Sequence, residues 1–294
     1  MKRYFMFGQT VESTISLPYL PESDAAPDFS LIWNQLHLDT EEDRLYAEMD
    51  GSACNVWMGC LGKYRIDPQE RIIHAQTDGE NMCYSTLFNI PMSIYFALRG
   101  DLLLHCSSVS AHGKLYSFCG NKGSGKSTLT TLISESYGGF YNDDSLRVSE
   151  DLSAWGGLQA VKLQDDTLHF ISCNKNNTLH QTAFQKWLYC QEPVYQPARL
   201  HHVIFLRRSP STDSFKVEKI TSKIHVYLKL IENVIGFNSC FPENLKNRIL
   251  STGLLEQISR RLPCYYLTCP NSLEGLRRAL AQQLLFRLFD EEVK

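Results

Sequence analysis

The chain has 294 residues, of which 43% are hydrophobic and 21% are charged, the composition of an ordinary globular protein. Its formal net charge of −3 at pH 7 gives no basic surface for a phosphodiester backbone, so nucleic acid is not an expected partner. No run approaches the ~18 apolar residues of a membrane span, and residues 1–9 turn polar too early for a signal peptide, so we expect a cytoplasmic protein without a membrane partner.

Residues 1–82 carry short apolar runs separated by turn residues, as in the runs 16–21 and 55–60 and the turn 49–52. This pattern is typical of strands and not of helices. We therefore expect a small, mainly β N-terminal module over residues 1–82. Because the nucleotide site predicted below does not need this module, it is the segment expected to recognise the substrate.

The first expected helix begins near Ile90 and Pro91, since proline suits a first helical turn, and ends at Gly100. Two strands are expected next, at 102–110 and 114–119, joined by a turn at 111–113. The second strand leads directly into a glycine-rich loop.

A helix at 127–136 follows that loop, with apolar residues on one face and a glycine stop at Gly138 and Gly139. A strand at 140–144 then ends in two acidic residues. Further strands are expected at 159–163, 203–206 and 265–268, and further helices at 221–235, 243–261 and 272–289. Strands and helices mixed in this order predict an α/β catalytic domain over residues 83–294.

The glycine-rich loop fits the pattern G-x-x-x-x-G-K-[ST] of a Walker A phosphate-binding loop at every defined position. Its glycines let the backbone curl so that successive N–H groups point at a phosphate, at the positive end of the following helix. Lys126 is expected to reach the β- and γ-phosphates and the Ser127 hydroxyl to ligate Mg²⁺. The residues expected to bind the nucleotide are Gly120, Asn121, Lys122, Gly123, Ser124, Gly125, Lys126, Ser127 and Thr128.

Asp143 and Asp144 stand at the end of the next predicted strand. A carboxylate there could hold Mg²⁺ or accept the proton of an attacking hydroxyl. Adjacent residues in a strand face opposite sides, so both can serve only if the strand has ended or bulged at this point. The alternative is an ordinary acidic turn before Ser145.

His105 lies on the predicted strand that pairs with the strand leading into Gly120. Such a hairpin would bring the imidazole to the mouth of the loop, where it could orient an acceptor hydroxyl or donate to a phosphate. The alternative is a partly buried histidine with a backbone partner. Arg207 and Arg208, which end another predicted strand, are candidates for binding an anionic substrate because guanidinium matches phosphate geometry.

Three elements together resemble the catalytic domain of bacterial HPr kinase/phosphorylase: the segment 103–109, the glycine-rich loop and the segment 139–144. They are still more similar to HPr-kinase-like proteins of ribosomal-peptide biosynthesis clusters, including lasso-peptide kinases. The resemblance is specific over residues 83–145 and compatible over the rest of the catalytic domain. It implies a P-loop kinase domain of the HPr kinase C-terminal type, which is like phosphoenolpyruvate carboxykinase, after the mainly β N-terminal module.

Carried over to this chain, the resemblance implies that Lys126 and Ser127 hold nucleotide and Mg²⁺ and that His105 lies beside the acceptor. It also implies that Asp143 and Asp144 supply a base and a metal contact. We take Asp144 as the metal contact together with Ser127, although the order of the two roles stays open. No copy of the second signature that HPr kinases use for phosphorolysis is found, so that reaction and an HPr substrate are not implied.

We therefore expect an ATP- and Mg²⁺-dependent kinase that transfers the γ-phosphoryl group to a hydroxyl, most simply a serine of a small protein or ribosomal peptide. Two alternatives stay open: a kinase for a small molecule, and a nucleotide-binding regulator without transfer activity. The acceptor, the choice of ATP over GTP, and a homo-oligomer of the kind that HPr kinases form are also open.

Overall fold

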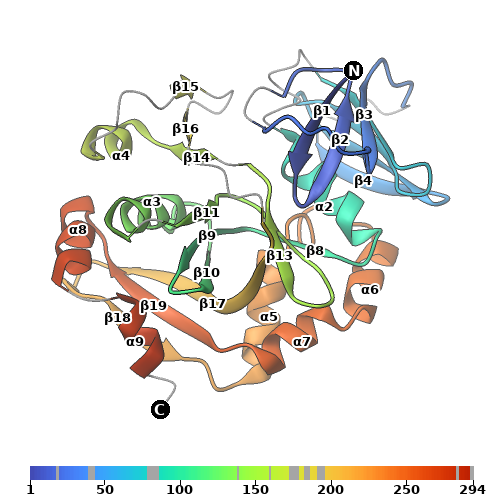
Figure 1. Cartoon of the computed structure of the whole chain (residues 1–294). Coiled ribbons are helices and arrows are strands. Elements are labelled where there is room, and N and C mark those ends of the chain that lie inside the picture. Colours follow the sequence, from blue (N-terminus) through green and yellow to red (C-terminus); the bar gives the residue numbers. More distant parts are fainter. Residues whose placement is uncertain are drawn as a thin grey trace.

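The computed structural model of the chain describes residues 1–17, 20–38, 44–77, 86–137, 139–158, 160–171, 179–181, 186–190, 196–282 and 285–291. Over these residues the protein is a mixed α/β structure with three sheets (Figure 1). The α/β class expected from the order of strands and helices is therefore confirmed.

The N-terminal segment forms a seven-stranded sheet, drawn in blue to cyan in Figure 1. Its strands are β1 (Lys2–Met6), β2 (Gln9–Ser13), β3 (Phe29–Trp33), β4 (Leu45–Asp50), β5 (Ala53–Met58), β6 (Lys63–Asp67) and β7 (Ile72–Gln76). Their order is β1-β2-β3-β7-β6-β5-β4, which makes β1 and β4 the two edges. Buried and partly exposed side chains alternate, as in β6, where Tyr64 and Ile66 are buried, because successive side chains of a strand face opposite sides.

The second sheet has nine strands and contains the strand that leads into the glycine-rich loop. Its strands are β8 (Leu102–Leu104), β9 (Cys106–Ala111), β10 (Lys114–Cys119), β11 (Phe140–Asn142), β12 (Leu146–Val148), β13 (Ser153–Gly156), β17 (Ala198–Ser209), β18 (Lys216–Lys219) and β19 (Cys264–Pro270). β10, β17 and β19 are parallel. Their carboxyl ends therefore meet at one edge of the sheet.

Helices cover both faces of this sheet. They are α3 (Lys126–Tyr137), α8 (Leu273–Gln282) and α9 (Leu285–Glu291) on one face, and α5 (Lys223–Asn233), α6 (Glu243–Ser251) and α7 (Leu254–Arg261) on the other. Alternate residues of the central strands supply the two cores. Phe118 and Ile204 pack in the core under α3, whereas Cys119 and Val203 pack in the core on the side of α5.

The N-terminal sheet shares the core on the side of α5. Helix α2 (Ile90–Ala97), whose eight residues are all buried, lies between the two sheets (Figure 1). The β1–β2 turn is also bound directly to the second sheet, because Phe7 N–H donates to Gly156 O (3.1 Å) and Arg147 Nη1 donates to Phe7 O (2.9 Å). The N-terminal sheet is thus fixed against the part of the chain that carries the loop.

A third, three-stranded sheet lies beside α3 and consists of β14 (Ala160–Leu163), β15 (Leu179–Gln181) and β16 (Trp187–Cys190). The short helix α4 (Asp165–Phe170) follows β14. Of the predicted strand 159–163, residue 159 lies outside the described residues.

Several predicted elements differ from the structure. The single strand 102–110 is wrong: β8 and β9 are separated at His105 and pair with different strands. The strand 140–144 is also wrong in extent, since β11 ends at Asn142. The helix 243–261 is two helices, α6 and α7, because Gly253 has φ +70°, a left-handed conformation that interrupts a helix. The helix 272–289 is described as α8 and α9, and residues 283–284 between them lie outside the described residues.

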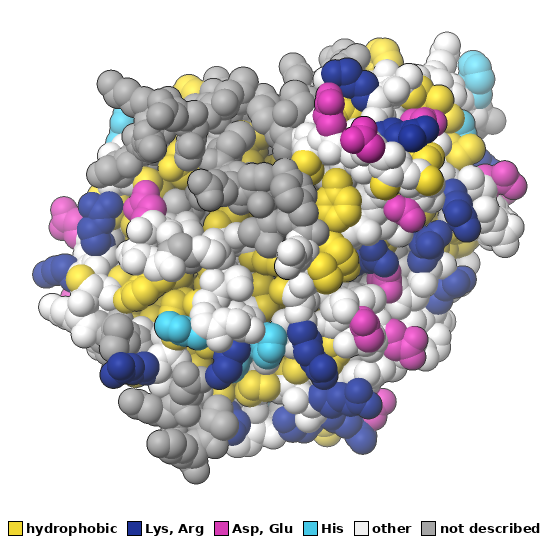
Figure 2. All heavy atoms as spheres, in the orientation of Figure 1, with side chains coloured by type: hydrophobic (Ala, Val, Ile, Leu, Met, Phe, Trp, Pro, Cys, Tyr) yellow, Lys and Arg dark blue, Asp and Glu magenta, His cyan; other side chains and the backbone are white. Residues whose placement is uncertain are grey.

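No helix in the described part of the chain is long and apolar enough to cross a membrane. On the face shown in Figure 2, basic and acidic side chains intermingle over the N-terminal sheet. This distribution agrees with the small net charge of the sequence.

The docking of the β1–β2 turn predicts a specific stability difference. Gly8 and Gly51 are both turn glycines with positive φ (+74° and +61°), but a Cβ at Gly8 would lie 2.4 Å from Trp155 Cδ2, whereas a Cβ at Gly51 would meet nothing within 4 Å. We expect Gly51→Ala to lower the free energy of unfolding by about 1 kcal/mol, the backbone cost alone. We expect Gly8→Ala to lower it by about 3 kcal/mol, because overpacking adds to that cost. Urea unfolding measures both, and equal losses would contradict the tight packing of the turn on Trp155.

Candidate active site

A cleft of about 950 Å³ opens where β10, β17 and β19 end. This is the edge at which open α/β sheets bind ligands. The cleft is lined by the glycine-rich loop, the acidic pair, His105, β14, the end of α5 and the segment after β19, and Met58 of the N-terminal sheet also reaches it.

The glycine-rich loop joins the end of β10 to the first residue of α3, as predicted. Gly120, Gly123 and Gly125 have φ values of +151°, +85° and +88°, which side chains other than glycine rarely adopt. A Cβ at Gly125 would lie 1.7 Å from Arg208 Nη2. Its conformation therefore requires glycine at Gly125, and a side chain there would also displace the Arg208 guanidinium.

Lys126, at the start of α3, folds back over the loop. Its Nζ donates to Gly120 O (2.7 Å) and Asn121 O (3.3 Å), and the residue is only 6% exposed. Burial lowers the pKa of this ammonium, although nearby thiols and the two aspartates act in the opposite direction. A partly desolvated cation inside a curled loop is a site for an anion.

Asp143 is almost fully buried, at 2% exposure, and follows directly after β11. Its Oδ1 accepts hydrogen bonds from Ser127 Oγ (2.9 Å) and from Ser107 Oγ, and its Oδ2 accepts one from the Lys162 backbone N–H (3.0 Å). The carboxylate thereby connects the first turn of α3 with β9 and β14. Asp143 is thus adjacent to the hydroxyl that the loop pattern assigns to Mg²⁺.

Asp144 has φ +69°, a left-handed conformation that aspartate adopts more readily than most residues. The strand has ended, so the rule that adjacent side chains face opposite sides no longer applies, and both carboxylates line the same cleft. Asp144 Oδ2 accepts a hydrogen bond from Lys162 Nζ (2.8 Å), and its Oδ1 lies 3.3 Å from His105 Nε2.

The ionisation of Asp144 follows from these contacts. Burial acts to raise its pKa, but the Lys162 ammonium and the His105 side chain outweigh burial and hold the pKa of this carboxyl well below its usual range. Burial acts to lower the pKa of the Lys162 ammonium, but the negative charge of Asp144 outweighs burial and raises this pKa above its usual value. Asp144 is therefore an anion at neutral pH, held between a lysine and a histidine.

His105 occupies the break between β8 and β9. In the antiparallel register of β9 and β10, Cys106 lies opposite Cys119. The preceding residue, His105, therefore lies level with Gly120, at the mouth of the loop. Asn233, the last residue of α5, fixes both positions: its backbone oxygen accepts from His105 N–H (2.7 Å) and its Oδ1 accepts from Gly120 N–H (3.0 Å). The histidine is therefore brought to the loop, as the predicted hairpin suggested, by a break in the strand that was not predicted.

Arg207 and Arg208 diverge, as adjacent residues of a strand do. Arg208 lines the cleft and braces the loop, with Nε donating to Ser124 O (2.9 Å) and Nη1 to Pro270 O (2.5 Å). Arg207 stacks on Tyr266 and lies 3.4 Å from Glu218, away from the residues that line the cleft. Of this predicted anion-binding pair, only Arg208 lies at the cleft.

The residues of the cleft fit a magnesium–nucleotide group. Ser127 Oγ and Asp143 Oδ1 lie 2.9 Å apart, and neighbouring ligands of an octahedral Mg²⁺ lie about 2.9 Å apart. Ser124 Oγ, in the loop, is buried and has no hydrogen-bond partner among the described residues, so it has donor capacity for a phosphate oxygen. Within the described residues no group of three or more His, Cys, Asp or Glu side chains is placed to hold a metal ion by itself.

Three residues of this site were missed by the sequence analysis: Ser107, Lys162 and Asn233. Lys162 carried a local signal, since it is a single charge within the apolar strand 160–163. Asn233 carried none, because a polar residue at the end of a helix is common.

The chain was also compared with known proteins. No protein-family model matches it, and no curated protein matches it. Its function is therefore inferred from the geometry of this cleft.

The Asp144–Lys162 pair predicts a stability difference that depends on pH. The side chains of Lys162 and Asp144 are only 15% and 26% exposed, and removing one partner of a buried pair leaves the other charge uncompensated. We expect Lys162→Met to lower the free energy of unfolding at pH 7 by about 2 kcal/mol. The matched control Lys2→Met removes an exposed pair, with exposures of 68% and 73%, and should cost less than about 0.5 kcal/mol.

The sign of the pH dependence follows from the two pKa shifts. The pKa of Asp144 is lowered on folding, so its contribution to the free energy of unfolding is complete above the unfolded value of about 3.9 and is lost as the pH falls below that value. The pKa of Lys162 is raised on folding, so its contribution to the free energy of unfolding persists up to about pH 10. The difference between wild type and Lys162→Met should thus be constant from about pH 5 to 9 and shrink at lower pH. Urea unfolding at several pH values measures it. A difference that grew on acidification would contradict the pairing.

Proposed function

We propose that this protein is an ATP- and Mg²⁺-dependent kinase that transfers the γ-phosphoryl group to a serine hydroxyl of a peptide or small protein. One observation carries the proposal: the two adjacent carboxylates are divided between two tasks. Asp143 contacts the Walker A hydroxyl of Ser127, while Asp144 is held toward the cleft by Lys162 and His105. A protein that only binds nucleotide has no need of the second carboxylate.

In this proposal the loop N–H groups and Lys126 bind the β- and γ-phosphates. Ser127 and Asp143 hold Mg²⁺, which when bound neutralises charge on the β- and γ-oxygens. This assignment reverses the expectation that Asp144 is the metal contact, because Asp143 is the carboxylate adjacent to Ser127. Arg208, which also lines the cleft, holds the loop through its hydrogen bond to Ser124 O.

Asp144 and His105 serve the acceptor. The acceptor oxygen forms a bond to the γ-phosphorus, the bond between that phosphorus and the bridging oxygen breaks, its electron pair stays on ADP, and the hydroxyl proton passes to Asp144. Because phosphoryl transfer has a loose transition state, little basicity is required of Asp144. A carboxylate that is ionised when the acceptor binds can orient the hydroxyl before the transfer.

The serine acceptor is supported by the resemblance to HPr-kinase-like proteins and by the extent of the cleft. The cleft continues from the loop to Met58 of the N-terminal sheet, which is more room than a phosphate group needs. The two alternatives are a kinase for a small molecule and a nucleotide-binding regulator without transfer activity. A phosphate-transfer assay separates them.

Transfer of labelled phosphate from ATP to serine-containing peptides tests the proposal. Lys126→Ala removes the phosphate-binding cation and Asp143→Asn removes the metal contact, so each should lower transfer at least about 100-fold. Asp143→Asn should also raise the Mg²⁺ concentration needed for half-maximal rate, whereas Asp144→Asn should lower kcat at an unchanged Mg²⁺ requirement. Lys219→Ala, an exposed lysine of β18, is the matched control and should transfer normally.

The outcomes are distinct. Full transfer by Lys126→Ala would refute the proposed site. Phosphorylation of free metabolites but of no peptide would favour a small-molecule kinase. ATP binding in calorimetry without turnover on any acceptor would favour the regulator.

A further inference from the structure

The two edges of the N-terminal sheet differ. The outer side of β1 is covered by residues 20–23, since Phe5 N–H donates to Pro21 O (2.8 Å) and Ser23 N–H donates to Arg3 O (3.0 Å). The other edge, β4, is paired with β5 alone. Across the described residues, no backbone hydrogen bond joins the outer side of β4 to another segment. Proteins usually block such an edge, because it can pair with any extended chain.

The register shows which backbone groups of β4 point away from β5. β4 and β5 are joined by the two-residue turn of Gly51 and Ser52, and Asp50 pairs with Ala53. In such a hairpin the closing pair exchanges both hydrogen bonds, and the pairs then alternate along the strands. Leu45, Ala47 and Met49 therefore turn their N–H and C=O groups away from β5. Leu45 and Met49 are partly exposed, whereas Ala47 between them is only 3% exposed. Six residues at about 3.4 Å each give an edge about 20 Å long.

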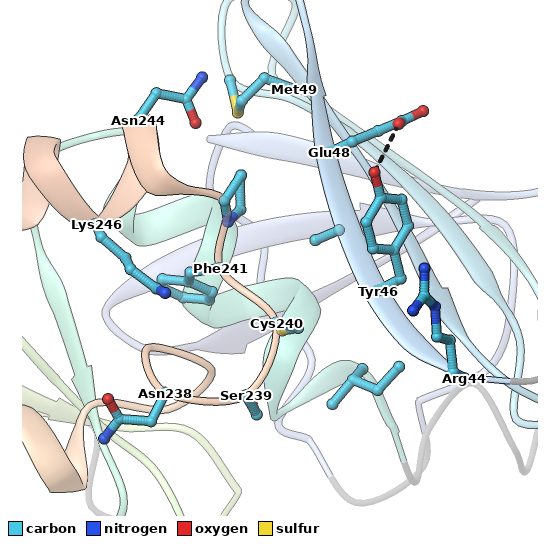
Figure 3. A pocket seen from close by; sticks show the side chains of 13 residues that line it. Arg44, Tyr46, Glu48, Met49, Asn238, Ser239, Cys240, Phe241, Asn244 and Lys246 are labelled. Carbon is cyan, nitrogen blue, oxygen red and sulfur yellow. Dashed lines mark hydrogen bonds between the residues drawn. The ribbon is translucent and has the colours of Figure 1, made fainter.

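This edge faces a groove and not open solvent. A groove of about 550 Å³ lies between β4 and the segment 238–246, which comprises the end of the α5–α6 connection and the start of α6, and Figure 3 shows the two walls facing each other. Arg44 on the β4 side and Lys246 on the other are cationic, whereas the Glu48 carboxylate accepts a hydrogen bond from Tyr46 (3.0 Å). The groove therefore favours a segment that is extended and not basic.

The groove is continuous with the candidate active site. Asn238 and Ser239 line both the groove and the cleft. On the opposite wall, Leu45 lines the groove and its register partner Met58 lines the cleft. The Leu45 end of the open edge thus leads toward the space beside Asp144 and His105.

We propose that the acceptor is an extended peptide that adds to β4 as a further strand, with its serine extending past Ser239 to Asp144. This inference rests on the proposed kinase function and specifies its substrate: a flexible, non-basic segment whose backbone is recognised, with specificity from the side chains that face the groove. Binding through main-chain hydrogen bonds tolerates many sequences, provided that the segment can extend.

The test uses the full-length protein, ATP with a labelled γ-phosphate, Mg²⁺, and a library of peptides in which one serine is flanked by randomised positions. The peptide with the highest kcat/KM is then resynthesised with a single backbone N-methyl group at each position in turn. An added strand turns every second N–H toward β4. We therefore expect kcat/KM to fall at least about tenfold at alternate positions on one side of the serine, and to change little at the positions between them.

Two variants of the protein test the proposed peptide-binding path, one at the junction of groove and cleft and one on β4. Ser239 is exposed at the junction of groove and cleft, and Ser239→Trp should raise the peptide KM at least about tenfold while the Kd for MgATP stays within twofold. Ser251→Trp, at the exposed end of α6 and outside both cavities, is the matched control and should leave both unchanged. Met49→Pro removes one N–H from the outer edge and should act like Ser239→Trp; thermal unfolding shows that each variant is folded.

The results separate this inference from the proposed function. N-methyl effects without alternation, or an unchanged peptide KM in Ser239→Trp, would overturn strand addition and leave the kinase proposal standing. Binding of MgATP without phosphorylation of any library peptide would overturn the peptide-kinase proposal, and the docking proposal with it.

Discussion

The buried carboxylate of Asp143 is the interaction on which the rest of the site depends. It accepts hydrogen bonds from Ser107, Ser127 and the backbone of Lys162, and so joins β9, α3 and β14 at one point. A carboxyl group at 2% exposure is tolerated only when its oxygens are satisfied in this way. The same bonds that compensate its burial hold the loop helix, the strand end and the third sheet in one relative position.

Around that carboxylate the charges are paired. Lys126 and Lys162 stand against Asp143 and Asp144, so the cleft is close to electrostatic balance before any ligand enters. A nucleoside triphosphate brings several negative charges, and a bound Mg²⁺ together with the loop N–H groups is the natural compensation. The Asp144–Lys162 contact keeps the second carboxylate ionised and compensates its charge within the cleft.

The N-terminal sheet is part of the same body as this cleft. It shares a hydrophobic core with α2, α5, α6 and α7, and its β1–β2 turn is bonded to β13. A peptide bound along β4 would therefore be held at a constant position relative to Asp144, and preorganised positioning of this kind is what accelerates a transfer between two bound groups.

The sequence by itself determined the local features: the loop with its preceding strand and following helix, the β9–β10 hairpin, helix α2 and the acidic pair. These depend on glycine conformations, on turn residues and on the spacing of apolar residues, all of which act over a few neighbouring positions. From the sequence, Asp143 and Asp144 can face the same site only if the strand has ended before them. The sequence could not decide whether the strand ends there. It also predicted a continuous strand through His105 and one helix over 243–261.

The tertiary structure decided what depends on residues far apart in the chain. Asn233 bonds both His105 and Gly120, and no local pattern marks a partner more than a hundred residues away. Lys162 acquires its role only because β14 packs beside the end of β11, and Arg208, not Arg207, braces the loop because of the direction in which β17 presents it. The contact of Asp143 with Ser127 and the contacts of Asp144 with Lys162 and His105 form only when β9, α3 and β14 pack together.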